Sequence, residues 1–508
     1  MLTLKSGVAL RRLDFSQGRV PVWVRWGLAL LGLICVFILA HSTRLEVGPN
    51  GYHKWRESDT AMVAENFYSH QMDFFRPQVN LVGNAGDGVV GMELPIYNFA
   101  AAIAFRFWGF NHMWPRLLSV LSGVLALIGV WRLALFFGGD SRIALLSAWV
   151  FAWSPLVYFY SYKIQPDILG LALSVWGVLF FSVWRQKNKF IFCVLSWLCL
   201  ALAGGIKPTF LSVGLPMLWI YGNESDPWRI WKRPELIIYG ICVLVIPVAW
   251  MTHAKKLTES FGEAYFYLGE NLLQELAGLL KWSFYQNVFL TWPIELALGV
   301  PAFVGIVIGV IIPRFRERVP KVVVPWLCGG GVVFILAAEH CATPHDYYYL
   351  VVVPPLSLIA AVGFFEMLQA RKWRYLAIVL LISMPIYAIM RMEGRFSSSA
   401  DIQALRGKVL ALGWERSTLD NRSITPIFGP LTLAVDNVPG YLLYATGLRG
   451  FNMFPDGDPS YFDLYRRRGA KWILTRKSIL ESTGGLGPYL GKQILEDGEI
   501  VLFEVNET

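Results

Sequence analysis

The chain has 508 residues, of which 55% are hydrophobic and only 16% are charged. A soluble protein carries about a quarter charged residues, so this composition excludes an ordinary soluble globular protein. The formal net charge of +9 requires no nucleic-acid partner, because cationic loops on the inner side of a membrane account for it.

Apolar runs of the length that crosses a bilayer as a helix recur along the chain. The first of them, Trp23 to Ala40, follows several arginines and resembles an uncleaved signal anchor. We therefore predict an all-α polytopic membrane protein. About eleven spans are expected, over residues 23–41, 117–138, 143–160, 168–184, 190–206, 208–222, 236–252, 289–312, 323–338, 349–368 and 374–391.

The polar connections between these spans alternate in charge. Positive loops stay in the cytoplasm, and with the N-terminus inside, the basic connections 132–142, 185–189, 228–233, 314–321 and 371–374 all fall there. The outward connections are then 42–116, 161–167, 206–208, 253–288, 339–348 and everything after 391. We interpret the apolar segment 94–110 as a helix in the membrane interface, since it is short and contains Asn98 and Arg106.

The composition changes abruptly near residue 395. We divide the chain into a transmembrane part, 1–394, which includes the outer loop 42–116, and a small α/β domain, 395–508, outside the membrane. The expected elements of this domain are helices over 400–412 and 461–468, strands over 424–428 and 472–474, and a hairpin that pairs 493–495 with 500–505.

The six cysteines all lie in or at the end of apolar runs, and no CxxC motif is present. Neither a disulfide framework nor a zinc site is suggested. Clusters of acids can hold a divalent cation, but the chain contains no compact ligand motif. We therefore expect no metal and no cofactor.

The predicted topology gathers charged residues at the outer face, namely Asp59, Glu65, Glu93, Arg116, Lys163, Asp167, Lys207, His340, His345 and Asp346. Charged groups at span ends are normally anchors that extend to the interface. Lys207 follows a glycine pair and precedes Pro208, a context that favours a helix break with a cation placed for a lipid phosphate. For His345 and Arg116 an anchoring role and a functional role are equally open, and the tyrosine run at 347–349 is typical of an aromatic belt.

Acids and cations on one membrane face suit sugar transfer from a lipid-phosphate carrier. A carboxylate takes the proton of the acceptor nucleophile. Cations balance the charge that develops on the departing phosphate, and further acids hold sugar hydroxyls. The pattern establishes only that the required residue types share a side.

The segment Asp59-Thr60-Ala61-Met62-Val63-Ala64-Glu65-Asn66 resembles the first periplasmic loop of the GT-C glycosyltransferases. The branch it resembles holds the protein O-mannosyltransferases and the aminoarabinose transferase of lipid A. Further similarities follow in the order of the family, over roughly residues 20–390: Glu93-Leu94-Pro95, Arg116-Leu117, Gln165-Pro166-Asp167, Lys207-Pro208, His345-x-Tyr347-Tyr348 and Pro354-Pro355.

This resemblance implies a GT-C fold and roles for particular residues. Asp59 is the leading catalytic candidate, as the base that activates the acceptor or as a residue that orders it. Asp167 and Glu93 would shape the sugar pocket. The donor phosphate would be held by Lys207, His345 and Arg116, and further substrate contacts are expected from Glu57, Glu65, Lys163 and Tyr347.

Two positions depart from the family pattern. Thr60 stands where an acid often follows the first aspartate, although Glu57 lies nearby. Leu94 stands where the lipid A branch has a lysine, which weakens an assignment to aminoarabinose transfer.

The resemblance therefore predicts an inner-membrane glycosyltransferase with its active site on the periplasmic side. It would move one sugar from a polyprenyl-phosphate donor to a lipid, surface glycan or protein, by a single displacement with inversion. The alternatives are a lipid-linked oligosaccharide ligase or oligosaccharyltransferase, a transporter of lipid-linked sugars, and a scaffold that recruits partners through 395–508.

Overall fold

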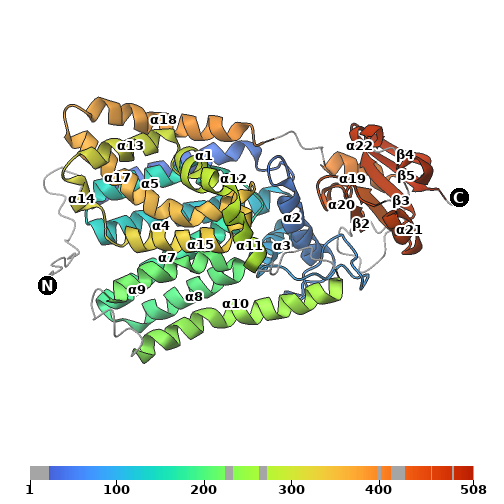
Figure 1. Cartoon of the computed structure of the whole chain (residues 1–508), viewed down its shortest axis with the longest axis horizontal. Coiled ribbons are helices and arrows are strands. Elements are labelled where there is room, and N and C mark those ends of the chain that lie inside the picture. The colour runs from blue at the N-terminus through green and yellow to red at the C-terminus, as the bar shows by residue number, and fades with distance from the viewer. Residues whose placement is uncertain are drawn as a thin grey trace.

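A computed structural model describes residues 22–222, 233–262, 272–396, 402–412, 430–458, 460–482 and 485–506. Long helices lie side by side in a bundle, and a small sheet lies beyond one end of it (Figure 1). The helices α2 (Lys54–Ser69) and α3 (Ile96–Trp108) lie between the bundle and the sheet, whereas α14 (Phe315–Arg318) lies at the opposite end.

The bundle contains α and 3-10 helices and one π-helix. They are α1 (Val22–His41), α4 (Met113–Gly138), α5 (Ser141–Ala152), α6 (Pro155–Tyr160), α7 (Asp167–Lys187), α8 (Phe190–Ile206), η2 (Pro208–Val213), α9 (Gly214–Gly222), α10 (Pro234–Phe261), α11 (Leu272–Ala277), η4 (Gly278–Leu280), α12 (Trp282–Tyr285), η5 (Gln286–Ala297), α13 (Val300–Ile311), α15 (Val323–Leu336), α16 (Ala338–Ala342), η6 (Asp346–Val352), α17 (Val353–Gln369) and α18 (Arg374–Glu393).

Within the described residues, six helices are long and apolar enough to cross a membrane: Val24–Arg44, Met113–Gly138, Asp167–Lys187, Pro234–Phe261, Asp346–Gln369 and Arg374–Glu393. A seventh span results if the bent pair Trp282–Ala297 and Val300–Ile311 counts as one. Ser141–Ala152, Phe190–Ile206 and Val323–Leu336 are shorter apolar helices. The chain is thus a multi-pass membrane protein, and the number eleven stays a prediction.

Two of the predicted spans are interrupted for local reasons. The span expected over 143–160 ends at Ala152, and α6 then restarts with Ser154 as its N-cap and Pro155 in its first turn. The span expected over 289–312 is bent by 107° between η5 and α13. Gly299, at φ +73°, makes this turn in a conformation that residues with a side chain rarely adopt.

Helix α3 occupies the segment predicted to lie in the membrane interface. It has only 13 residues and packs beside α2 at the end of the bundle. Its Tyr97, Asn98 and Phe105 are buried, while Phe107 and Trp108 are exposed. This length is insufficient to cross a bilayer, and the position in the membrane interface stays a prediction.

The C-terminal part forms a five-stranded sheet in the order β2-β1-β3-β5-β4. Strand β1 (Thr432–Val435) pairs in parallel with β2 (Gly450–Met453) and β3 (Trp472–Arg476), and β5 (Ile500–Val505) pairs antiparallel with β3 and β4 (Leu490–Asp497). The helices of this part are α19 (Ile402–Leu410), α20 (Tyr441–Thr446), α21 (Ser460–Arg467) and α22 (Lys477–Ser482).

The predicted helix 461–468, strand 472–474 and final hairpin are confirmed by α21, β3 and the β4–β5 pair. The helix expected over 400–412 corresponds to α19, of which 400 and 401 are not described. The strand expected over 424–428 lies outside the described residues.

One apolar core of the sheet is shared with α2, and a second core lies within the C-terminal part, around Val435, Phe451 and Ile473. Met62 and Phe67 of α2 belong to the same buried cluster as Leu442 of α20 and Leu474 of β3. The outer loop between α2 and α3 also joins the edge of the sheet, because Gly450 donates a 3.0 Å hydrogen bond to the carbonyl of Asn80. Helix α2 is therefore held between the bundle and the C-terminal part.

Candidate functional site

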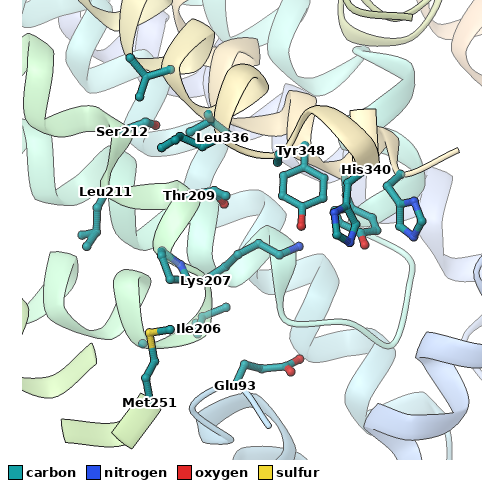
Figure 2. A pocket seen from close by; sticks show the side chains of 18 of the residues that line it. Glu93, Ile206, Lys207, Thr209, Leu211, Ser212, Met251, Leu336, His340 and Tyr348 are labelled. Carbon is teal, nitrogen blue, oxygen red and sulfur yellow. The ribbon is translucent and has the colours of Figure 1, made fainter. Parts of the chain in front are cut away.

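A cavity of about 960 Å³ opens beside the start of α2 (Figure 2). Its polar wall is formed by Arg56, Glu93, Lys207, Glu275, His340, His345, Tyr347 and Tyr348. Its apolar wall is formed by Leu211, Leu215, Leu218, Trp250, Met251, Val332, Val333 and Leu336. The cavity thus combines a charged end with an apolar face contributed by η2, α9, α10 and α15.

The loop that carries Glu93 is clamped between two helices. Trp250 of α10 donates a 2.8 Å hydrogen bond to the carbonyl of Met92, and the backbone NH of Leu94 donates to the carbonyl of Gly205 at 2.9 Å. At Gly91 an added Cβ would lie 1.9 Å from the carbonyl oxygen of Ala254. These contacts hold the Glu93 side chain on the cavity wall.

Four charged side chains form one ionic network at the polar wall. The Nζ of Lys207 lies 2.6 Å from an oxygen of Asp167, and Nη2 of Arg56 lies 3.0 Å from an oxygen of Glu93. Arg56 also approaches the second oxygen of Asp167, at 3.8 Å from its Nε. Two cations and two carboxylates therefore balance one another, which makes their burial tolerable.

Lys207 is oriented by the helix break that precedes it. It follows α8 in an extended conformation, and Pro208 begins η2 directly afterwards. Its Nζ lies 3.8 Å from the ring centroid of Tyr347 and 5.0 Å from that of Tyr348. Figure 2 shows the Lys207 side chain extending toward Tyr348 and His340. Burial lowers the pKa of Lys207, and the Asp167 carboxylate opposes this shift.

Arg56 is the functional candidate that the sequence analysis missed. Burial acts to lower the pKa of its guanidinium, but Glu93 and Asp167 outweigh burial and raise the pKa, so the side chain stays charged. The sequence spacing could have indicated this role, because Arg56 precedes Asp59 by three residues and the two lie on one face of α2. Glu275 and His340 also line the cavity and were not among the predicted site residues.

His345 lies on the cavity wall beside His340, with ring centroids 5.0 Å apart. Burial lowers the pKa of His345 to about 3, and the neighbouring histidines, Lys207 and Arg56 contribute in the same direction. Its Nδ1 lies 2.7 Å from the hydroxyl of Thr343. His345 is therefore a neutral hydrogen-bonding group near pH 7.

Arg116, Glu57 and Lys163 come together in a cluster away from the cavity wall, and their side chains are completely buried. Glu57 accepts from Arg116 at 3.1 Å and from Lys163 at 2.9 Å. Arg116 further donates to the carbonyls of Val47, Gly48 and Tyr162. This arrangement ties α2 to α4 and to the loop before α7, as expected of a structural cluster.

Asp59 and Glu65 lie further along α2. Asp59 is buried, and it follows Trp55 and Arg56 of the cavity wall by one helical turn. Glu65 instead pairs with Arg406 of α19 through two hydrogen bonds of 2.6 and 2.9 Å. The structure thus brings together Glu93, Asp167, Lys207, His345 and Tyr347, and separates Glu65 from them. Asp59 does not line the cavity, and its catalytic role stays a prediction.

The described residues contain no group of three or more His, Cys, Asp or Glu side chains arranged to hold a metal ion. The cavity presents charge pairs and an apolar surface. Such a site can receive an amphipathic ligand whose anionic group meets cations while its hydrocarbon part contacts aliphatic side chains.

Parts of the sequence are similar to known proteins. Residues 93–253 match the family described as dolichyl-phosphate-mannose-protein mannosyltransferase. Over 224 residues the chain is 30% identical to the undecaprenyl phosphate-alpha-4-amino-4-deoxy-L-arabinose arabinosyl transferase of Erwinia tasmaniensis. This alignment covers 42% of the present chain, and the chain spans only 38% of that relative.

Two solved structures share the fold over most of the chain. The ArnT protein from Cupriavidus metallidurans bound to undecaprenyl phosphate has a TM-score of 0.62 at 15% identity, over 95% of this chain and 98% of that one. The archaeal oligosaccharyltransferase AglB from Archaeoglobus fulgidus has a TM-score of 0.52 at 11% identity, over 93% and 73%. The present chain therefore shares the fold of these two solved structures, and a segment of its sequence matches the mannosyltransferase family model.

Proposed function

We propose that this chain is a membrane glycosyltransferase that moves a single sugar from a polyprenyl-phosphate donor to an acceptor on the periplasmic side of the inner membrane. The observation that carries the proposal is the cavity, since one continuous space joins an ionic network to an apolar wall. A lipid-phosphate sugar has the same division into an anionic head and a hydrocarbon tail.

The tail of the donor would lie along the apolar wall, where Leu215, Leu218 and Met251 are partly exposed. Its phosphate would meet Lys207 and Arg56. Binding of the phosphate would draw these cations from their carboxylate partners, so that the positive charge already present at the site stabilises the leaving group. His345 would act as a neutral hydrogen-bonding group at the same wall.

The acceptor hydroxyl would attack the anomeric carbon of the sugar in a single displacement with inversion. We propose that Asp59 takes the proton of that hydroxyl, and that Glu93 and Asp167 hold sugar hydroxyls. General base catalysis of this kind contributes about 10²–10⁴-fold to a rate. We assign Arg116, Glu57 and Lys163 to the support of α2, because their side chains are completely buried.

The relatives support a polyprenyl-phosphate carrier more strongly than any particular acceptor. One of them is named for an undecaprenyl-phosphate sugar, and a solved structure of the same fold binds undecaprenyl phosphate. The acceptor that we propose is a periplasmic lipid, surface glycan or protein. Leu94 argues against close equivalence to the lipid A branch, since here it packs with Trp250 and Ala254 in an apolar cluster.

We further propose that the sheet of the C-terminal part lies in the periplasm beside the acceptor site. Support comes from its contact with α2, whose first turn lines the cavity and whose later turns share the core of the sheet. A part held so close to the cavity is suited to limiting which acceptors reach it.

The test is a lipid and glycan profile of cells that lack the gene, compared with cells that carry the wild-type gene or an Asp59→Asn version. We expect a surface molecule to lose one sugar and the polyprenyl-phosphate sugar to accumulate, with rescue by the wild type only. Loss of a whole oligosaccharide together with its carrier would instead support a ligase or a transporter. Full rescue by Asp59→Asn would remove the base from the scheme.

A further inference from the structure

An acid–imidazole pair on the cavity wall has no part in the scheme above. The Nδ1 of His340 on α16 lies 2.7 Å from a carboxylate oxygen of Glu275 on α11. Both side chains line the cavity, and Glu275 is buried. A carboxylate at Nδ1 fixes the orientation of the ring and stabilises its protonated form.

His340 also lies close to the space where the donor phosphate is expected. The rings of His340 and Tyr348 have centroids 5.5 Å apart, and Lys207 approaches the same tyrosine ring to 5.0 Å. Figure 2 shows Lys207 extending toward Tyr348 and His340, with Glu93 on the other side of the lysine. A phosphate that contacts Lys207 in front of Tyr348 would therefore lie beside the His340 ring.

We propose that His340 is a catalytic residue that donates a proton to the departing lipid phosphate, and that Glu275 is the positioning residue that holds it. This inference rests on the proposed transferase function. The new bond forms between the acceptor oxygen and the anomeric carbon, while the bond from that carbon to the phosphate oxygen breaks. The electron pair of the broken bond stays on the phosphate, which receives the proton of His340.

The proton balance is closed by the other groups of the scheme. The acceptor proton passes to Asp59, which releases it to water, and His340 regains a proton from water after the products leave. Protonation of the leaving phosphate lowers its negative charge at the moment when Lys207 and Arg56 are still partly held by carboxylates. His340 thus compensates the negative charge of the leaving phosphate, which the ionic network, neutral as a whole, does not do.

The protonation of His340 is influenced by neighbours on several elements. The titratable groups that surround it are Glu275 and Lys281 from the segment before η5, Glu339 and Cys341 on its own helix, and His345 and Tyr348 on the following segment. Glu339 is paired with Lys281, whereas the carboxylate of Glu275 contacts the His340 ring.

The first experiment measures binding of undecaprenyl phosphate, as the leaving group, to the full-length protein in lipid nanodiscs between pH 5.5 and 8.5. We expect His340→Gln to bind about tenfold more weakly than wild type at the acidic end, as for loss of one charged hydrogen bond. At the alkaline end the two proteins should bind equally, because an imidazole ring that has lost its proton offers no charge to the phosphate. A difference that does not change with pH would overturn the proposal.

Two further variants separate proton donation from packing. Glu275→Asp should keep the pH-dependent difference, whereas Glu275→Gln should reduce it, since the carboxylate that orients the His340 ring is gone. The matched control is His253→Gln on α10, whose ring contacts the carbonyl of Phe75 and is not on the cavity wall. The same pH-dependent loss in this control would also overturn the proposal.

The last experiment measures the rate of sugar transfer by the wild type and His340→Gln, with a polyprenyl-phosphate sugar donor prepared from the native cells. We expect His340→Gln to lower kcat and to flatten its dependence on pH. If the wild type transfers sugar and the variant is equally fast, the inference fails and the proposed function stands. If the wild type transfers nothing, the proposed function fails, and the binding experiment decides separately whether His340 contacts the phosphate.

Discussion

Lys207 at the end of α8 places its Nζ 2.6 Å from a carboxylate oxygen of Asp167, in the first turn of α7. The two residues are 40 positions apart in the chain, and of the two only Lys207 lines the cavity. The Asp167 side chain is 2% exposed and that of Lys207 14%. The lysine is thus the member of the pair that a ligand in the cavity reaches.

Replacement of Lys207 should affect both stability and donor binding. Lys207→Met leaves the buried Asp167 carboxylate with Arg56, at 3.8 Å, as its remaining ion-pair partner among the described residues. Breaking a buried pair typically costs about 3–5 kcal/mol. We expect a lower thermal unfolding temperature and weaker binding of undecaprenyl phosphate. Lys207→Arg keeps the charge and should retain most of the stability.

The double variant Lys207→Met with Asp167→Asn separates the two effects. Removal of both charges should restore much of the stability without restoring binding, because the unpaired carboxylate is gone while the cation is still missing. Recovery of binding in the double variant would show that Lys207 does not contact the phosphate.

Asp59→Asn is expected to remove transfer without changing the fold. Asparagine has nearly the same volume but cannot accept the acceptor proton, so the rate should fall by about 10²–10⁴-fold. The measurement is the transfer rate of purified protein together with its unfolding temperature. Asp87→Asn serves as a control, since its side chain is 40% exposed in the outer loop. Unchanged transfer in Asp59→Asn would exclude the base assignment.

The buried cluster around Glu57 should govern stability. Glu57→Gln leaves Arg116 and Lys163 as two buried cations without their shared carboxylate, a loss of about 3–5 kcal/mol by analogy with other buried pairs. Thermal unfolding in detergent would report it, with the exposed Glu46→Gln as the control. Normal stability combined with lost transfer would instead assign this cluster to the substrate.

His345 should make the protein less stable in acid. The pKa of His345 in the folded protein is about 3, below the ordinary value of 6.5. The unfolded chain therefore binds more protons between these values, and the stability present above pH 6.5 is lost progressively as the pH falls toward 3. Between pH 7.5 and pH 4.5, the unfolding temperature should decrease more for the wild type than for His345→Gln. Equal decreases would contradict the assignment.

The pair of Glu65 and Arg406 should couple α2 to the C-terminal part. Its two hydrogen bonds are charged and largely buried, so a double-mutant cycle with alanine at both positions should give a coupling energy of about 1.5–3 kcal/mol. Unfolding in denaturant would measure the cycle. The exposed pair of Lys408 and Asp497 is the control, for which about 0.2–1 kcal/mol is expected.

Several parts of the site could be predicted from local sequence. Lys207 follows a glycine pair and precedes a proline, and this helix break is present as expected. Glu93, His345 and Tyr347 were predicted from their motifs, and all three line the cavity. In these cases the side chain belongs to a loop or a helix end, where local chemistry decides the direction of the chain.

Other parts depend on partners that are distant in the chain. Arg116 and Glu65 match a site pattern as well as Lys207 does, yet Arg116 is enclosed by Glu57 and backbone carbonyls, and Glu65 is paired with Arg406. Arg56 was overlooked because its role depends on Glu93 and Asp167, which approach it only in the folded chain.

The sequence by itself determined that this chain is a helical membrane protein with charged residues gathered at one end, because apolar length and loop composition are local properties that a bilayer selects directly. Only the tertiary structure decided which of those charges reach the cavity and which are buried in support of α2. The physical reason is that a buried charge must find partners, and the packing of helices far apart in the chain decides which partners are within reach.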